Sequence, residues 1–395
     1  ALAAVAAAQG LAPRIAVVTG DDLMPQFEQL RAAGLRDLHT GEAPPAALYS
    51  ANAYVGARGI AQALALGADI VITGRCVDSA VVVGVLAHEF GWGWDDWDRI
   101  AAGTLAGHVI ECGAQATGGL FTDWQQVPGW ADIGYPLVRL QADGSFELSQ
   151  PEGAGGLVTR QTVGEQLLYE IGDPAAYELP DVVCDFTQVA ITDLDGGRVR
   201  VQGARGRAPG GRYKVTATYQ QGWHIAIMMA IRGQRALAKA QRTADALLAR
   251  TRRQMQAAGF ADYEDTLVEL LGAESMYGPH RRVADSREIV LRIAARHRDR
   301  RALAFLQKEA SSAGTSMGPG TRSHFGGRSD VQSIIRTASF LLPKAAVAVQ
   351  VQAAPDEAPA AVEAADAAAA PAAPNPPEAT AADAAASGPT VRIAL

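Results

Sequence analysis

Two short polar loops follow runs of β-branched residues and could carry chemistry. Residues 20–22 (GDD) follow the apolar run at 14–19, and residues 74–78 (GRCVD) follow the run at 69–73. Continuous apolar strands that alternate with helices indicate a parallel sheet covered on both faces. In such sheets ligands bind beyond the carboxyl ends of the strands, where helices begin. We therefore predict that the two loops lie side by side at one edge of the sheet.

The second of these loops contains the side chains for an anion site. Gly74 lets the backbone approach a ligand, and Arg75 can bind a carboxylate or phosphate in a bidentate manner. Asp78 is a candidate acid or base, and its structural alternative is to cap the following helix. Neither a GxGxxG nor a Walker pattern is present, so these loops give weak support for nucleotide binding.

A second group of reactive side chains lies at His108, Glu111 and Cys112. His108 and Glu111 share one face if a helix extends that far. Their spacing suits a general acid/base pair or a metal, and Cys112 could be a nucleophile. The structural alternative is a core histidine beside an inert buried thiol. We take the three as catalytic candidates and expect no metal.

The third group is the segment at 310–328, which is rich in glycine and serine and contains Arg322 and Arg328. We interpret it as a long loop that precedes a helix at 331–340. Backbone N–H groups of such a loop can bind an anion, and two arginines suit a CoA phosphate or a carboxylate. We predict that the segment from Arg322 to Arg328 closes over one cleft formed by the other two groups. A mobile surface loop is the alternative.

Composition limits the class of protein. The chain has 395 residues, 48% of them hydrophobic, which is enough for a sizeable core. The net charge of −7 gives no basic field for nucleic acid. No apolar run is long enough to span a bilayer. The chain has three widely spaced cysteines, which favours a reducing compartment. We therefore expect a cytoplasmic protein, and the lack of a long apolar run leads us to expect no membrane association.

The order of patterns predicts four regions. Residues 1–150 read as an α/β domain with a parallel sheet and flanking helices, preceded by a section that is missing. Residues 151–346 read as a mixed α+β domain, with a long helix at 226–259. Residues 347–388 read as a flexible linker, because 353–388 are almost wholly Ala, Pro, Asp and Glu and are expected to be disordered. Residues 389–395 regain strand character and are expected to begin a truncated C-terminal module.

Several ordered motifs resemble the acyclic terpene utilisation family, AtuA, a family long described as a domain of unknown function. The resemblance runs from the start of the chain to about residue 346. Its motifs are 72–79 (ITGRCVDS), 98–108 (DRIAAGTLAGH), 111–119 (ECGAQATGG), 134–136 (GYP), 151–153 (PEG), 156–158 (GLV), 179–183 (LPDVV) and 203–206 (GARG).

The resemblance implies a metabolic setting. It places the chain in bacterial catabolism of acyclic terpenes such as citronellol and geraniol, through CoA thioesters and next to an acyl-CoA carboxylase. It also implies a further strand-helix section at the start and a small ferredoxin-like module after the linker. It supplies no agreed reaction and no catalytic residues.

Two functions remain open from the sequence. The first is an enzyme, a lyase or hydrolase acting on a branched acyl-CoA or its carboxylated derivative, with CoA as part of the substrate. The second is a non-catalytic subunit or binding module of an assembly linked to an acyl-CoA carboxylase. The enzyme requires an anion site and an acid/base pair in one cleft. We expect a small-molecule ligand and a homo-oligomer. An oxidoreductase or hydratase with an unrecognised cofactor mode ranks last.

Overall fold

The computed structural model describes residues 1–322, 329–353 and 389–394. These residues form two compact units made of both helices and sheets, as expected for the α/β class. Residues 151–216 belong to the first unit, although the sequence analysis placed them in the second domain. Unit 1 comprises Ala1–Ala43, Ser50–Thr216 and Ser339–Leu395, and unit 2 comprises Pro44–Tyr49 and Ala217–Ala338.

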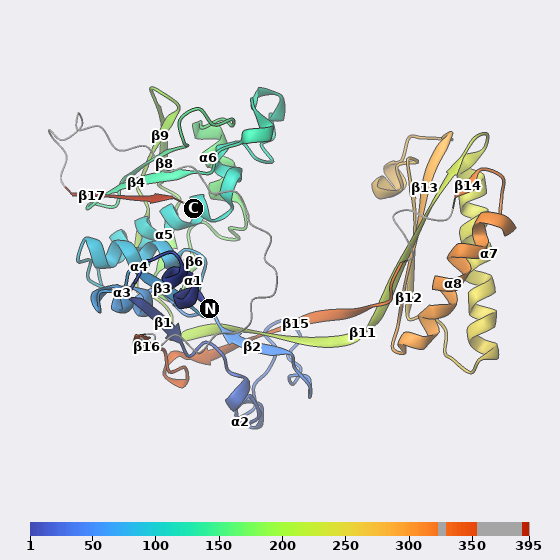
Figure 1. Cartoon of the computed structure of the whole chain (residues 1–395), viewed down its shortest axis with the longest axis horizontal. Helices are drawn as coiled ribbons and strands as arrows, with labels where there is room; N and C mark the ends of the chain where they lie inside the picture. The colour runs from blue at the N-terminus through green and yellow to red at the C-terminus, as the bar shows by residue number, and fades with distance from the viewer. Residues whose placement is uncertain (323–328, 354–388, 395) are drawn as a thin grey trace. The chain divides into compact units, whose positions relative to one another are not determined.

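The first sheet of unit 1 contains the pair of parallel strands that the sequence predicted. Strands β1 (Ile15–Thr19) and β3 (Ile70–Thr73) are parallel, with Val18 opposite Thr73. Strand β16 (Gln350–Ala353) pairs with β1 in the antiparallel sense. Helix α3 (Arg58–Ala65) packs near all three strands (Figure 1). The carboxyl ends of β1 and β3 therefore meet at one edge of the sheet.

Two further sheets of unit 1 are antiparallel, so a parallel sheet throughout the first 150 residues is not confirmed. Strands β4 and β5 lie within the first 150 residues, and a tight turn containing Gly144 connects them. One sheet has the order β17 (Thr390–Ala394), β4 (Leu137–Gln141), β5 (Phe146–Ser149), β9 (Arg198–Gln202), β8 (Ala190–Leu194). The other has the order β10 (Arg205–Arg207), β7 (Val183–Asp185), β6 (Tyr177–Glu178).

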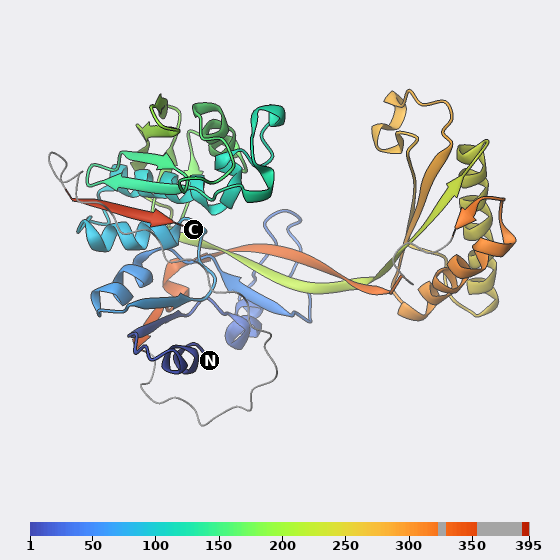
Figure 2. The ribbon, with the colours of Figure 1, turned by 45° about the horizontal axis from the view of Figure 1, so that its top comes forward.

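The C-terminal strand belongs to unit 1. The strand character expected at residues 389–395 is found in β17, which pairs with β4 (Figure 2). Val391 and Ile393 pack against the core beneath it. The predicted linker at 347–388 lies largely outside the described residues. Its first part, which is described, contains β16.

Helix α5 (Trp97–Glu111) forms the centre of unit 1. Every residue from Ile100 to Ile110 is buried. Gly107 allows a close approach, since an added Cβ would lie 2.8 Å from Cα of Ser79. Ser79 immediately precedes helix α4 (Ala80–Glu89), so the end of α5 reaches the loop that follows β3.

The remaining elements of unit 1 cover these sheets and α5. Helix α6 begins with a capping box in which Thr159 and Thr162 satisfy each other's backbone N–H groups. The elements are α1 (Leu2–Ala8), η1 (Met24–Gln26), α2 (Phe27–Ala32), β2 (Ser50–Ala53), η2 (Gly113–Thr117), η3 (Trp124–Gln126), η4 (Trp130–Asp132), α6 (Arg160–Leu168) and η6 (Lys344–Ala346).

Unit 2 is an antiparallel sheet with α7 and α8 packed on one face (Figure 1). Its elements alternate as β-α-β-β-α-β, and the strand order is β12-β13-β11-β14. This order and alternation are those of the split β-α-β, or ferredoxin-like, arrangement. The elements are β11 (Arg212–Arg232), α7 (Ala236–Ala257), β12 (Asp265–Leu271), η5 (Ser275–His280), β13 (Glu288–His297), α8 (Arg300–Ser316), β14 (Thr321–Arg322) and β15 (Gln332–Pro343). The first residues of β11, up to Thr216, and the last residues of β15, from Ser339, belong to unit 1.

Two predicted helices are wrong in whole or in part. The helix predicted at 226–259 begins only at Ala236, because the preceding residues belong to β11. Ile227, Met229 and Ile231 are buried at every second position, which is the period of a strand. The helix predicted at 331–340 is also wrong, since these residues lie in or next to β15.

The loop predicted at 310–328 is wrong over its first part, because α8 continues to Ser316. Ala310 and Ala313 are buried against the core of unit 2. Ser312 and Ser316 donate hydrogen bonds to carbonyl oxygens of the preceding turn. Serine hydroxyls satisfied in this way are compatible with a helix, although the composition suggested a loop. None of the helices in the described part of the chain has both the length and the apolar character needed to cross a membrane.

A carboxylate connects two distant segments of unit 1. Asp37 accepts hydrogen bonds from the N–H groups of His39, Thr40 and Ser339, at distances of 2.8–3.0 Å. Burial alone would raise the pKa of Asp37, but the N–H donors outweigh it and lower the pKa to about 2. Asp37 therefore holds the residue 37–40 turn against β15.

We predict that Asp37→Ala lowers the free energy of unfolding by about 2 kcal/mol at neutral pH, because charged hydrogen bonds are lost. The folded pKa of about 2 lies below the ordinary value of 3.8. The contribution is therefore complete above about pH 4 and is lost as the pH falls toward about 2. Urea unfolding across this range measures it, with the exposed Asp195→Ala as control. A wild-type advantage that persists undiminished at the lowest pH would contradict the assignment.

Candidate functional site

The loops after β1 and β3 lie side by side, as predicted. The buried carboxylate of Asp21 connects them, because its Oδ2 accepts a hydrogen bond from the backbone N–H of Arg75 at 2.7 Å. The same oxygen accepts a hydrogen bond from Nδ2 of Asn52 at 2.9 Å. Asp21 therefore fixes the backbone of the second loop and is not free to act as an acid or base on a ligand.

Gly74 has a structural role in this arrangement. A Cβ added at Gly74 would lie 1.9 Å from Oδ1 of Asp21, so no other residue fits without moving the carboxylate. Gly74 was predicted to let the backbone approach a ligand. The structure shows a close approach to the Asp21 side chain, and Gly74 also lines a cavity.

Arg75 and Asp78 face each other at the surface. The two side chains are 3.6 Å apart, between Nη2 of Arg75 and Oδ1 of Asp78, and are 42% and 62% exposed. The guanidinium also lies over the ring of Tyr54, 4.2 Å from its centroid. Asp78 does not cap α4, because the N-cap residue is Ser79 and no side-chain capping bond is formed. The ring and the carboxylate therefore orient Arg75.

His108 and Glu111 form a hydrogen-bonded pair at the end of α5. Nδ1 of His108 lies 3.0 Å from Oε1 of Glu111, and Nε2 lies 3.2 Å from the carbonyl oxygen of Leu167. The His108 side chain is 2% exposed and that of Glu111 is 17% exposed. The backbone carbonyl of His108 accepts a hydrogen bond from Gln166 at 2.9 Å. The imidazole is thus held on both sides by α5 and the end of α6.

These contacts determine how the pair holds protons. A carbonyl oxygen can only accept, so Nε2 of His108 must carry a hydrogen that it donates to Leu167. Nδ1 and the Glu111 carboxylate would then both be acceptors unless another proton lies between them. A hydrogen bond between Nδ1 of His108 and Oε1 of Glu111 therefore needs a proton on one of these two atoms.

A cavity of about 280 Å³ is lined by residues of the loop after β3 and by Glu111 of the second predicted group. Its lining combines apolar side chains with one guanidinium and two carboxylates. His108 lies behind Glu111, in the core. The lining residues are Gly74, Arg75, Cys76, Asp78, Val81, Val82, Gly107, Ile110 and Glu111.

Cys112 is not among the residues that line this cavity. Burial raises the pKa of its thiol, and the carboxylates of Glu111 and Glu170 raise it further despite a hydrogen bond with Gln166. A nucleophilic cysteine requires a neighbouring cation that lowers its pKa. That condition is not met, so Cys112 is better explained as a packing residue.

Neither Arg322 nor Arg328 is found among the residues that line this cavity. Arg322 lies in β14 of unit 2, opposite Ala230 of β11, whereas the cavity lies in unit 1. Arg328 lies outside the described residues. The expectation that this segment closes over the cavity stays a prediction. Within the described ranges, no group of three or more His, Cys, Asp or Glu side chains could hold a metal ion.

Several residues that contact the site could not be recognised from the sequence. Tyr54 and Asn52 precede α3, and Gln166 lies in α6, so all three are distant in sequence from the motifs. Apolar residues such as Val81 on the cavity wall also gave no signal, because one valine in an apolar helix is unremarkable. Only tertiary packing brings these residues to the cavity.

We predict that Asp21→Ala destabilises unit 1 by about 1–3 kcal/mol, because the N–H groups of Arg75 and Asn52 lose the buried carboxylate that accepts their hydrogen bonds. Urea unfolding measures the loss, and hydrogen exchange of the Arg75 amide should accelerate. The exposed Asp123→Ala serves as the control and should change neither quantity. Unchanged exchange at Arg75 in the Asp21→Ala variant would show that the carboxylate does not hold the loop.

The chain was compared with known proteins. No curated protein and no solved structure matches it. The family model of the acyclic terpene utilisation family protein AtuA matches residues 1–353, which include the cavity and all of unit 2. This match confirms the resemblance in the sequence motifs. The chain belongs to the acyclic terpene utilisation family AtuA.

Proposed function

We propose that this chain is an enzyme of acyclic terpene utilisation that acts on a branched acyl-CoA or its carboxylated derivative, as a lyase or hydrolase. The observation that supports it most is the cavity of unit 1, where Arg75 and Glu111 line one space. Glu111 is hydrogen-bonded to the buried imidazole of His108, and one proton lies between them in the proposed mechanism. An anion site and an acid/base pair in one cavity meet the minimum requirement for such an enzyme.

Arg75 binds the carboxylate of the carboxylated substrate. Its guanidinium offers a planar fork of N–H donors that matches a carboxylate. Tyr54 and Asp78 orient the side chain but leave it partly exposed, so a ligand can reach it. A substrate carboxylate would displace Asp78 from the guanidinium, since both compete for the same donors.

The apolar wall accommodates the branched acyl group. Val81, Val82 and Ile110 line one side of the cavity. The volume of about 280 Å³ lies just below the usual range of small-molecule pockets, roughly 300–1,000 Å³, so the cavity suits a short acyl group. The acyl end of the thioester fits this space, and the nucleotide part of CoA stays outside it.

Glu111 transfers the proton. In a lyase reaction the proton leaves or joins the carbon next to the thioester carbonyl, and in hydrolysis it leaves the attacking water. Either step needs a positioned base that can later return the proton. His108 stabilises the carboxylate when charged and accepts or donates through Nδ1. Leu167 holds the imidazole in one tautomer throughout.

The second candidate is a non-catalytic subunit or binding module. It is favoured by exposed apolar side chains next to η3 and η4, namely Leu120, Trp124 and Trp130. Large exposed aromatic residues are typical of interfaces. The same surface supports our expectation of a homo-oligomer. A cytoplasmic location is supported by three free thiols in the described residues.

We predict that Arg75→Ala weakens binding of a carboxylated, branched acyl-pantetheine about tenfold or more, through loss of a charge-assisted contact. The pantetheine thioester carries no phosphate, so its binding reports on the cavity of unit 1. Isothermal titration measures the affinity. The control Arg99→Ala removes an exposed arginine paired with Asp96 and should bind normally. Equal affinities for wild type and Arg75→Ala would contradict the assignment.

We predict that Glu111→Gln lowers turnover of the branched acyl-CoA about 100-fold or more, because the shared proton can no longer be transferred. Thiol release measures hydrolysis, and mass spectrometry of the acyl product measures lyase activity. The control Glu89→Gln changes an exposed carboxylate outside the cavity. Full turnover by Glu111→Gln, with normal ligand binding, would favour the non-catalytic module instead.

A further inference from the structure

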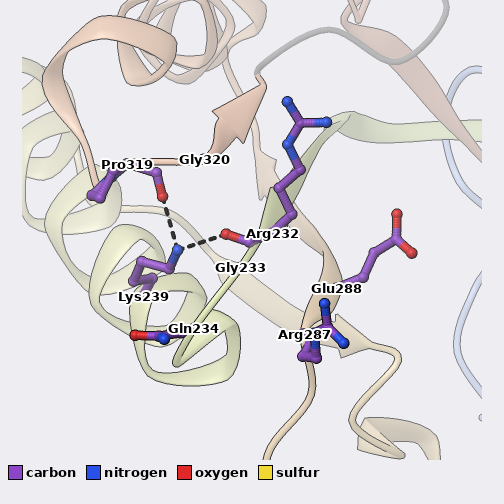
Figure 3. Close-up of a pocket in the computed structure, with 8 residues that line it drawn as sticks. All are labelled: Arg232, Gly233, Gln234, Lys239, Arg287, Glu288, Pro319 and Gly320. Carbon is purple, nitrogen blue, oxygen red and sulfur yellow. Dashed lines mark hydrogen bonds between the residues drawn. The ribbon is translucent and has the colours of Figure 1, made fainter.

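A second and larger cavity, of about 910 Å³, lies wholly within unit 2 (Figure 3). It is open to solvent and forms where β11 ends and where β13 and β14 begin. Its cationic lining residues are Arg232, Lys239 and Arg287, and Glu288 is the acidic one. The sequence analysis identified none of these residues, and the proposed reaction in unit 1 does not use them.

Lys239 organises the cavity wall. Its Nζ donates to the carbonyl oxygens of Arg232 at 2.6 Å and of Pro319 at 2.8 Å (Figure 3). These bonds connect the first turns of α7 with the end of β11 and with the residues just before β14. An ammonium has three donors, so one remains for a ligand. The positive charge of Lys239 is therefore fixed at the cavity, with no carboxylate to neutralise it among these contacts.

The two arginines differ from others of unit 2. Arg250, Arg292 and Arg298 each pair with a glutamate. In the part of the chain that the structure describes, Arg232 and Arg287 form no such ion pair, although Glu288 stands opposite Arg232 in the sheet register. Both are exposed, so an incoming ligand finds their donors available.

The charge at this cavity is opposite to that of the whole chain. Three cations and one carboxylate line it, whereas the chain as a whole has a net charge of −7. Another cavity, beside the start of α7, is lined by two further cations and one carboxylate, namely Arg235, Arg281 and Asp285.

We propose that this cavity of unit 2 binds an organic phosphate that carries two or more negative charges, such as a nucleoside diphosphate. Two exposed arginine forks and a fixed ammonium line one cavity and suit the several oxygens of adjacent phosphates. The volume lies within the usual range for a small-molecule ligand. Gly233 and Gly320, both with positive φ, let the two strand ends run close beside the ligand.

The test is calorimetric titration of the full chain with inorganic pyrophosphate, ADP and citrate at low ionic strength. Pyrophosphate and ADP should bind, with affinity that falls as salt is added. Citrate carries a similar charge on carboxylates and should bind at least tenfold more weakly. Absence of binding by both phosphates, or equal binding of citrate, would overturn the proposal.

Variants locate the site. Arg232→Ala and Arg287→Ala should each weaken ADP binding about tenfold, and both residues are exposed, so folding should be unchanged. Arg253→Ala, an exposed arginine elsewhere on α7, should bind normally. Glu288→Gln should bind severalfold more tightly, because a competing carboxylate is removed.

The site is distinguishable from the cavity of unit 1. Arg75→Ala should leave ADP binding unchanged, and loss of binding in that variant would assign the phosphate to unit 1 and overturn the proposal. If Arg253→Ala and Arg232→Ala weakened ADP binding equally, the binding would reflect unspecific attraction to a basic surface. That result would also overturn the proposal. The outcome does not depend on whether the chain proves to be a lyase or a hydrolase.

Discussion

The burial of helix α5 is the constraint on which the candidate site depends. Every residue from Ile100 to Ile110 is enclosed, so a polar side chain on this helix must find its partners within the protein. His108 finds Glu111 on one side and the carbonyl of Leu167 on the other. The carbonyl fixes the tautomer, and the fixed tautomer forces a proton to be shared with Glu111. Because Gly107 lets α5 approach Ser79, the shared proton lies beside the loop that carries Arg75.

The two units present cationic side chains in different ways. In unit 1 a single guanidinium is oriented by Tyr54 and Asp78 beside an apolar wall, which suits one charge on an otherwise apolar ligand. In unit 2 several cations surround an open cavity at the strand ends, which suits a compact polyanion. The split β-α-β arrangement of unit 2 occurs with many functions, so its fold alone assigns none. In both units the proposed ligand is inferred from the arrangement of charged side chains.

The sequence allowed the local elements that depend on short patterns to be predicted. The parallel pair β1 and β3, the adjacent loops and the His108–Glu111 spacing followed from periodicity and from strand-loop-helix order. The end of β11 was mistaken for helix, because this apolar strand is followed after three residues by the long helix α7. The cation pair Arg232 and Arg287 could not be found, since sheet register alone brings these distant residues together. Tyr54 and Leu167 reach the site in the same way, through packing that no local pattern records.

The most direct measurement for the site in unit 1 is a crystal structure of the full chain soaked with a carboxylated, branched acyl-CoA. The account predicts that the acyl group occupies the cavity between Val81 and Ile110, with its carboxylate on Arg75. The carbon next to the thioester carbonyl, or the carbonyl itself, should lie within hydrogen-bonding reach of Glu111, directly or through one water. An acyl group bound elsewhere, with this cavity empty at saturating ligand, would contradict it.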